Sequence, residues 1–181
     1  IQRHISSAKG FFGYMKKISL VQSSPFELIN SPKSPSRLPN VLSPEEVSQL
    51  LNFKPKNIQD KRDLAIIELI YSSGLRVSEA VNSNLSDFED NNNFLRVIGK
   101  GSKTRLVPVG RFAQNAIKIW IKERKKILTI DDALFVNLRG GRISARSIQE
   151  RLKSIALMQG LPPVNPHMLR HSFATHLLES S

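Results

Sequence analysis

The sequence predicts a mainly α-helical protein with one small antiparallel β-sheet, and three observations predict that class. Apolar residues recur at three- and four-residue steps in several stretches, which is the spacing of one face of a helix. Two β-prone runs, residues 94–98 and 104–109, flank a glycine-containing connection that is typical of a hairpin. Of the 181 residues, 40% are apolar and 23% are charged, so the chain can bury a core.

The first forty residues combine a helix with a proline-rich connector. Apolar residues from Ile5 to Ile18 keep helical spacing and predict a single amphipathic helix. One helix of that length cannot bury its own apolar face, so we expect residues 1–18 to end a helical domain. Residues 19–40 carry four prolines among serines and asparagines, which favours an extended interdomain linker.

A folded domain is predicted from residue 41 to residue 181. A capping-box sequence at residues 43–46 opens a helix to about residue 53. The stretch 61–73 is too apolar for a surface helix, so we expect it at the core, ended by Gly74. Further helices are expected at residues 77–81, 112–126, 145–158 and 166–179, and a short strand at residues 134–136.

The charge of the chain is large and unevenly placed. Lys and Arg number 27 against 15 Asp and Glu, a net charge of +12. Residues 96–126 hold ten bases and one acid, a net +9, whereas residues 45–90 hold nine acids and five bases, a net −4. A concentrated basic stretch attracts phosphate, so we expect Lys103 and Arg105 to contact DNA. A solvated lysine-rich helix face is the alternative for residues 118–126.

Several classes of protein are excluded by composition. The chain has no cysteine, which excludes a disulfide scaffold or a thiolate metal site and agrees with a reducing compartment. No apolar run approaches the roughly 20 residues that span a bilayer, and the first residues do not resemble a signal peptide. We therefore expect a soluble, cytoplasmic protein without a membrane partner. The chain lacks an initiator Met and stops within an apolar pattern, so we expect it to be truncated at both ends.

Four residues are candidates for chemistry. Arg76 follows a glycine and precedes a short helix, where it could serve a site or simply pair with Glu79. Lys100 lies between two glycines at the hairpin tip, where a flexible ammonium could donate a proton or remain solvated. His167 and Arg170 lie three residues apart on one face near the positive end of the last helix, which attracts anions.

Neither a metal nor another cofactor is expected. His167 and His171 have the spacing of a helical zinc site, but Met168 stands where a zinc peptidase has its glutamate and no third ligand is near. We expect His171 and His176 to be half-buried and to hydrogen-bond locally. The glycine-containing segment 99–103 leads into a strand, so it is not a P-loop. Arginine, lysine and histidine without paired carboxylates favour metal-free stabilisation of a phosphoryl transition state.

Three motifs follow one another in a fixed order. They are Ser73–Glu79, then Val97–Lys103 with Leu106–Gly110, then Pro166–Leu178. In that order they resemble the tyrosine recombinases, specifically the bacterial Xer type, and residues 178–181 favour the XerC branch over the XerD branch. Ser6–Tyr14 and Pro39–Leu51 extend the resemblance over almost the whole chain. The resemblance implies that residues 1–18 end a core-binding domain and that residues 41–181 belong to a catalytic domain.

The resemblance also implies a role for each candidate. Arg76 and Arg170 would hold the nonbridging oxygens of the scissile phosphate through charge-assisted forks. Lys100 would protonate the departing 5′-oxygen, and His167 would assist proton transfer at the nucleophile and bind phosphate. In the family a tyrosine attacks the phosphodiester and forms a 3′-phosphotyrosyl link, so neither metal nor ATP is required.

The nucleophile is the point at which the chain departs from this pattern. Only Tyr14 and Tyr71 are present, the first in the N-terminal helix and the second in the apolar helix, where we expect it in the core. The family's tyrosine follows the position of His176 by several tens of residues, beyond residue 181. We therefore expect the chain as given to form no covalent intermediate with DNA.

Two hypotheses of different classes remain. The first is an enzyme, part of a Xer-type recombinase that acts on double-stranded DNA with a second recombinase in a four-protomer synapse. Its role would be to resolve chromosome dimers at cell division, with a cell-division DNA translocase as a further partner. The second is an inactive, truncated DNA-binding module, and a phage or transposon integrase is a further alternative. The reading frame downstream of Ser181 distinguishes the first two.

Overall fold

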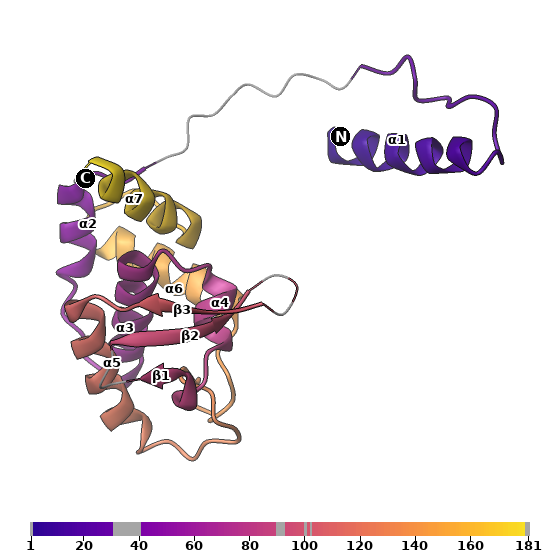
Figure 1. Cartoon of the computed structure of the whole chain (residues 1–181). Coiled ribbons are helices and arrows are strands. Elements are labelled where there is room, and N and C mark those ends of the chain that lie inside the picture. The colour runs from indigo at the N-terminus through magenta and orange to yellow at the C-terminus, as the bar shows by residue number, and fades with distance from the viewer. Residues whose placement is uncertain (1, 31–40, 90–92, 100, 102, 180–181) are drawn as a thin grey trace. The chain divides into compact units, whose positions relative to one another are not determined.

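The computed structural model describes residues 2–30, 41–89, 93–99, 101 and 103–179, and the chain divides into two units. Unit 1 comprises Ile1–Leu38 and unit 2 comprises Pro39–Ser181. Figure 1 shows both units along the chain, and each is described by itself below. Over the described residues, no helix combines the length and the apolar character needed to cross a membrane.

Unit 1 contains one helix, α1 (Gln2–Lys17), in its described part, which confirms the predicted N-terminal helix. The chain folds back after α1 and brings the ring of Phe26 to within 5.3 Å of the ring of Phe12, measured between centroids. Other apolar side chains of α1 remain open to solvent: Phe11 is 57% and Tyr14 61% exposed. The apolar face of the helix is thus only partly covered within unit 1.

Unit 2 combines helices with a three-stranded sheet. In chain order its elements are α2 (Pro44–Leu51), α3 (Ile58–Ser73), α4 (Val77–Asn82), the 3-10 turn η1 (Leu85–Asp87), β1 (Phe88–Glu89), β2 (Phe94–Ile98), β3 (Thr104–Pro108), α5 (Arg111–Arg124), α6 (Ala145–Met158) and α7 (Pro166–Glu179). The strands pair antiparallel in the order β1-β2-β3, which confirms the predicted fold class. β1 was not predicted, because two residues are too short to show a period.

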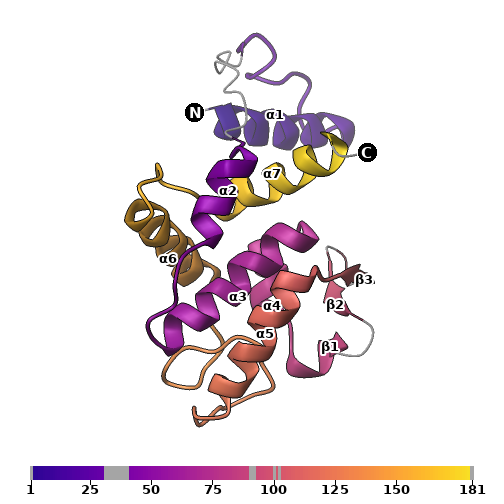
Figure 2. The ribbon, with the colours of Figure 1, turned by 90° about the vertical axis from the view of Figure 1, so that its left-hand side faces the viewer.

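Helix α3 forms the centre of unit 2. Ala65, Ile66, Leu69 and Ile70 are each 0% exposed, as the continuous apolar character of this stretch predicts. The helix packs mainly against α5 and α7, and it also contacts α2, α4 and α6 (Figures 1 and 2). Every element that carries a candidate site residue is therefore positioned against α3 or the adjoining sheet.

Two helix ends form at the residues where the sequence predicts them. The amide of Ser43 donates to the Glu46 carboxylate at 2.8 Å, and the Glu46 amide donates to the Ser43 hydroxyl at 3.2 Å, which completes the capping box of α2. At the end of α3, Gly74 adopts φ 59°, the left-handed conformation that a glycine cap supplies. Both predictions are confirmed.

The short strand predicted at residues 134–136 is wrong, although the segment is fully buried. Its backbone carbonyls accept hydrogen bonds mostly from side chains instead of from a neighbouring strand. Arg124 Nε donates to Ala133 at 2.9 Å, and Trp120 Nε1 donates to Leu134 at 2.8 Å. Only two isolated bridges, from residues 133 and 136, link the segment to other backbone. Buried carbonyls need donors, and here long side chains from α5 supply them.

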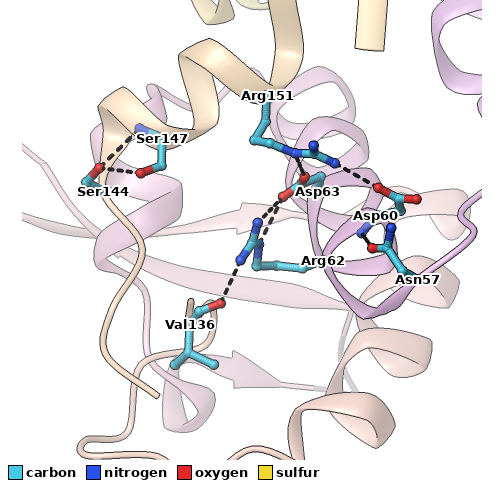
Figure 3. A network of polar contacts seen from close by, with 8 residues as sticks. All are labelled: Asn57, Asp60, Arg62, Asp63, Val136, Ser144, Ser147 and Arg151. Atoms are coloured by element: carbon cyan, nitrogen blue, oxygen red, sulfur yellow. Dashed lines mark hydrogen bonds and ion pairs between the residues drawn. The ribbon is translucent and has the colours of Figure 1, made fainter. Parts of the chain in front are cut away.

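A buried ionic network joins α3, α6 and this segment (Figure 3). Arg62 binds the Asp63 carboxylate at 2.7 Å and the Val136 carbonyl at 3.1 Å, and Arg151 of α6 binds Asp60 at 2.7 Å as well as Asp63. Two guanidinium groups face two carboxylates, so the network is neutral. A buried charge is tolerated when its partner compensates it, and this network holds α6 on α3.

Candidate active site

Three arginines from three separate elements converge on the carboxylate of Glu79. Arg76 Nη1 lies 3.1 Å from Glu79 Oε1, and Arg105 Nη2 lies 3.1 Å from Oε2. Arg170 Nη1 lies 3.8 Å from the same Oε2. The Glu79 side chain is only 5% exposed, whereas the three arginine side chains are between 33% and 52% exposed. We call these four residues the arginine cluster.

The turn between α3 and α4 delivers Arg76 to the cluster. Arg76 is the N-cap residue of α4, and its amide donates to Glu79 Oε2 at 2.9 Å, so the first turn of α4 orients both side chains. The preceding Gly74 lies directly under Phe173 of α7, because a Cβ at that glycine would lie 2.5 Å from the Phe173 ring. This close approach brings α7 against the α3–α4 turn, and with it Arg170 near Arg76.

Helix α7 is held in one orientation. The Asn165 side chain accepts hydrogen bonds from the amides of His167 at 3.0 Å and Met168 at 3.1 Å, which caps its N-terminus. Leu169 is 0% exposed, and buried Ser172 accepts a hydrogen bond from the Leu42 amide at 2.9 Å. His167 lies one turn before Arg170 and is exposed, at the positive end of the helix.

The hairpin supplies the third arginine. Arg105 lies in β3 opposite Val97 of β2 and reaches the cluster beside Gly99, where an added Cβ would lie 2.8 Å from Arg105 Nη1. Lys103, the other predicted DNA contact, precedes β3 and is exposed. Lys100 lies outside the described residues. Arg105 therefore belongs to the candidate site itself, in addition to the basic stretch of sequence for which it was singled out.

The cluster is electrostatically unbalanced. Burial by itself would raise the pKa of the Glu79 carboxyl, but hydrogen bonds from the Arg76 amide and the Arg105 guanidinium outweigh burial and lower that pKa. Three guanidinium groups then face one carboxylate, a net charge of +2. Arg170 Nη1 is buried without a hydrogen-bond partner among the described residues. An unsatisfied buried donor costs about 1–3 kcal/mol or more when charged, so Glu79 compensates Arg170 only in part.

A groove of about 580 Å³ in unit 2 does not coincide with the cluster. It lies between α2, α3 and α7, and Tyr71, Glu68 and His176 line it. His176 is half-buried, as predicted, and its Nδ1 lies 3.0 Å from the Tyr71 hydroxyl on another helix. His171 is exposed instead of half-buried. Tyr71 is half-buried and packs at the edge of the core.

Within the described part of the chain, no group of three or more His, Cys, Asp or Glu side chains could hold a metal ion. The shallow depression beside the cluster, about 370 Å³, is lined by Arg76, Ser78, Glu79, Asn82, Ile98 and Gly99. Its donors are guanidinium and amide groups, which suit an anionic ligand. The arrangement can bind and neutralise a phosphoryl group, and it offers little to a cation.

Glu79 is the cluster residue that the sequence does not single out, because there it appears only as an ion-pair partner of Arg76. The Arg76–Glu79 ion pair is part of the arginine cluster, because Glu79 contacts all three arginines at once. The signal was an Arg-x-x-Glu spacing at a helix start, where the acid reaches back to the cap. Nothing local in the sequence relates Glu79 to the distant Arg105 or Arg170.

Known proteins are similar to this chain over nearly its whole length. Residues 40–181 match the Phage integrase family. The chain is 46% identical over 177 residues to tyrosine recombinase XerC of Shewanella amazonensis, covering 97% of this chain and 60% of that protein. It is 42% identical to XerC of Pseudomonas savastanoi, covering 100% and 61%. A crystal structure of XerH recombinase bound to difH DNA superposes with a TM-score of 0.75 at 26% identity, covering 88% and 48%. The chain thus spans about three fifths of these curated relatives.

Proposed function

The chain belongs to the phage integrase family, and we propose that it supplies the phosphate-binding part of a site-specific recombinase. The reaction would cut and rejoin double-stranded DNA through a 3′-phosphotyrosyl intermediate. The XerC names of the relatives and the DNA-bound XerH structure support this assignment, and so does the resemblance to the Xer type in the sequence.

The observation that carries the proposal is the net charge of +2 of the arginine cluster, in which Arg170 Nη1 has no hydrogen-bond partner among the described residues. A phosphodiester is a monoanion with two nonbridging oxygens, and arginine donates to such oxygen pairs in a planar fork. Arg76 and Arg170 approach Glu79 from α4 and α7, so a phosphate beside them would be held from two sides. Glu79 would keep both guanidinium groups in place before DNA arrives.

In the proposed mechanism, a tyrosine oxygen attacks phosphorus and forms the new bond while the bond from phosphorus to the 5′-oxygen breaks. Arg76 and Arg170 neutralise the charge that grows on the nonbridging oxygens. Lys100 gives its proton to the departing 5′-oxygen, and exposed His167 accepts the tyrosine proton and binds phosphate. No metal and no ATP take part, because the phosphotyrosyl link conserves the energy of the phosphodiester.

We further propose that the nucleophile is neither Tyr14 nor Tyr71. The Tyr71 hydroxyl is engaged by His176 at 3.0 Å and lies in the large groove of α2, α3 and α7. Burial, and then the charge of Glu68, raise the pKa of Tyr71, which is the opposite of what a nucleophile needs. Tyr14 belongs to α1 in unit 1.

The test begins with selection of target DNA from a pool of random duplexes by the purified chain. The selected DNA is then incubated with the 181-residue chain and with a chain extended by the reading frame that follows codon 181. We expect an SDS-resistant adduct only from the extended chain. In that chain, Arg170→Lys should slow adduct formation by about 10²- to 10³-fold and change DNA affinity little. An adduct mapped to Tyr14 or Tyr71, or a normal rate for the variant, would contradict the proposal.

For the cellular role we propose resolution of chromosome dimers at cell division, together with a second Xer-type recombinase in a four-protomer synapse. A plasmid carrying two copies of the selected site tests this role. Excision of the intervening DNA should require both the extended chain and a second recombinase. Efficient excision by the extended chain alone would instead favour a mobile-element integrase.

A further inference from the structure

A second basic surface lies on α5, outside the arginine cluster. It is a groove of about 400 Å³ between α5 and the η1–β1 segment. We call it the α5 groove, and its lining residues are Leu85, Phe88, Lys118, Ile121, Lys122 and Lys125. Three lysines thus surround three apolar side chains at one place on the surface.

The α5 groove and the arginine cluster lie toward opposite ends of the sheet. β3 begins at Thr104, and Arg105 at that end reaches Glu79. β3 ends at Pro108 and leads into α5, which begins at Arg111. Figure 1 accordingly shows α4 and α5 at opposite ends of the strands. A ligand in the α5 groove is therefore separate from a phosphate bound by the cluster.

The charges of Lys122 and Lys125 in the α5 groove are not balanced by the nearby acids Asp87 and Glu123. Asp87 is occupied by Arg96 at 2.9 Å and by the Asn84 amide at 2.9 Å. Glu123 binds Lys61 and Lys126, each at 2.6 Å. Among the residues that the structure describes, Lys122 and Lys125 form no ion pair. Like charges at helical spacing destabilise a helix slightly, and an anionic partner would offset that cost.

The floor of the α5 groove indicates what kind of anion fits. Leu85, Phe88 and Ile121 are partly buried and pack on the core, so their remaining surface opens between the lysines. A nucleic-acid backbone presents phosphates but no apolar side chain that could cover this floor. An acidic peptide presents both carboxylates and apolar side chains. We propose that the α5 groove binds an acidic peptide segment with apolar anchors, contributed by a partner protein.

The experiment measures fluorescence anisotropy of a labelled synthetic peptide that alternates aspartate with leucine and phenylalanine. Two comparison peptides replace the aspartates with asparagine or the apolar residues with serine. The protein variants are Lys122→Glu/Lys125→Glu and the matched control Lys54→Glu/Lys153→Glu, which makes the same charge change at exposed positions of unit 2 outside the groove. Affinity for a random DNA duplex is measured for the same proteins.

We expect the acidic apolar peptide to bind the unmodified chain and the control alike. Affinity for the Lys122→Glu/Lys125→Glu variant should be lower by about tenfold or more, because each reversal replaces an ion pair with repulsion. Both comparison peptides should bind more weakly. Equal peptide binding by the two variants would place the peptide elsewhere, for example on the arginine cluster, and would overturn the proposal. It would also be overturned if the peptide did not bind, or if the groove variant lost DNA affinity as strongly as peptide affinity.

Discussion

Gly74 is the position where a single methyl group should disturb both stability and the site. Its φ of 59° is left-handed, and its Cβ position lies 2.5 Å from Cδ1 and 2.7 Å from Cε1 of Phe173. Gly74→Ala therefore imposes two separate costs. The first is a backbone conformation that L-residues disfavour, and the second is displacement of an aromatic ring on α7.

The two costs can be estimated separately. A non-glycine residue in the left-handed conformation costs about 1–2 kcal/mol. Overpacking against a ring that is held on a helix costs about a further 1–3 kcal/mol. Gly160, after α6, provides a matched control, because it has φ 73° but its Cβ position meets nothing closer than Gln49 Nε2 at 3.8 Å. Gly160→Ala should therefore show the backbone cost alone.

Urea denaturation gives the free energies of unfolding. Gly74→Ala should lower that of unit 2 by about 1–3 kcal/mol more than Gly160→Ala does. Phe173→Leu removes the ring, so the double variant Gly74→Ala/Phe173→Leu should lose less than the sum of the two single changes. If the two alanine variants were equally stable, the close packing of α7 on the α3–α4 turn would be refuted as the constraint on Gly74.

Three further predictions concern other features of unit 2. Lys103→Ala with Arg105→Ala should flatten the slope of log affinity for duplex DNA against log salt by up to about two units, and an unchanged slope would show that the hairpin does not face DNA. Burial raises the pKa of Glu68 to about 7, so its protonated form favours the folded state. Its contribution to stability is full below the unfolded pKa and is lost as the pH rises through about 7. The melting temperature of Glu68→Gln should therefore fall less between pH 5 and pH 8 than that of the unmodified chain, whereas parallel curves would contradict the shifted pKa. Trp120→Phe removes the indole donor that lies 2.8 Å from the buried Leu134 carbonyl. The free energy of unfolding measured in urea should therefore fall by about 1–3 kcal/mol. A loss below about 0.5 kcal/mol would show that another donor replaces the indole.

Helix ends and central elements could be predicted from the sequence because the interactions that form them are local. The capping box of α2 depends on residues three apart, and Gly74 ends α3 by its own backbone freedom. The segment 133–136 could not be predicted in the same way. Its apolar residues indicate burial, but its carbonyl partners are Arg62, Trp120 and Arg124, which lie 9 to 74 residues away. An apolar run shows that the backbone is buried, but it does not show which groups donate hydrogen bonds to the buried carbonyls.

The site shows the same division between local and distant information. Arg76 and Arg170 were recognised through motifs of adjacent residues. Their meeting at Glu79, and the entry of Arg105 into the cluster, depend on contacts across 26 residues and more. The sequence predicts Arg105 only as a DNA contact, because charge density along the chain contains no information about which carboxylate a side chain reaches. The packing of the fold decides which side chains meet. Gly74 packs against Phe173, and β3 pairs with β2.

Charge balance distinguishes Arg62 and Arg151 from the three arginines of the site. Arg62 and Arg151 lie with Asp60 and Asp63, so each positive charge has a carboxylate, and Arg62 is 4% exposed. That neutral network is complete and has no need of a ligand. The arginine cluster has one carboxylate for three guanidinium groups, and Arg170 Nη1 has no hydrogen-bond partner among the described residues. A cluster with these properties is stabilised further by an added anion, which is the property that a phosphate-binding site requires.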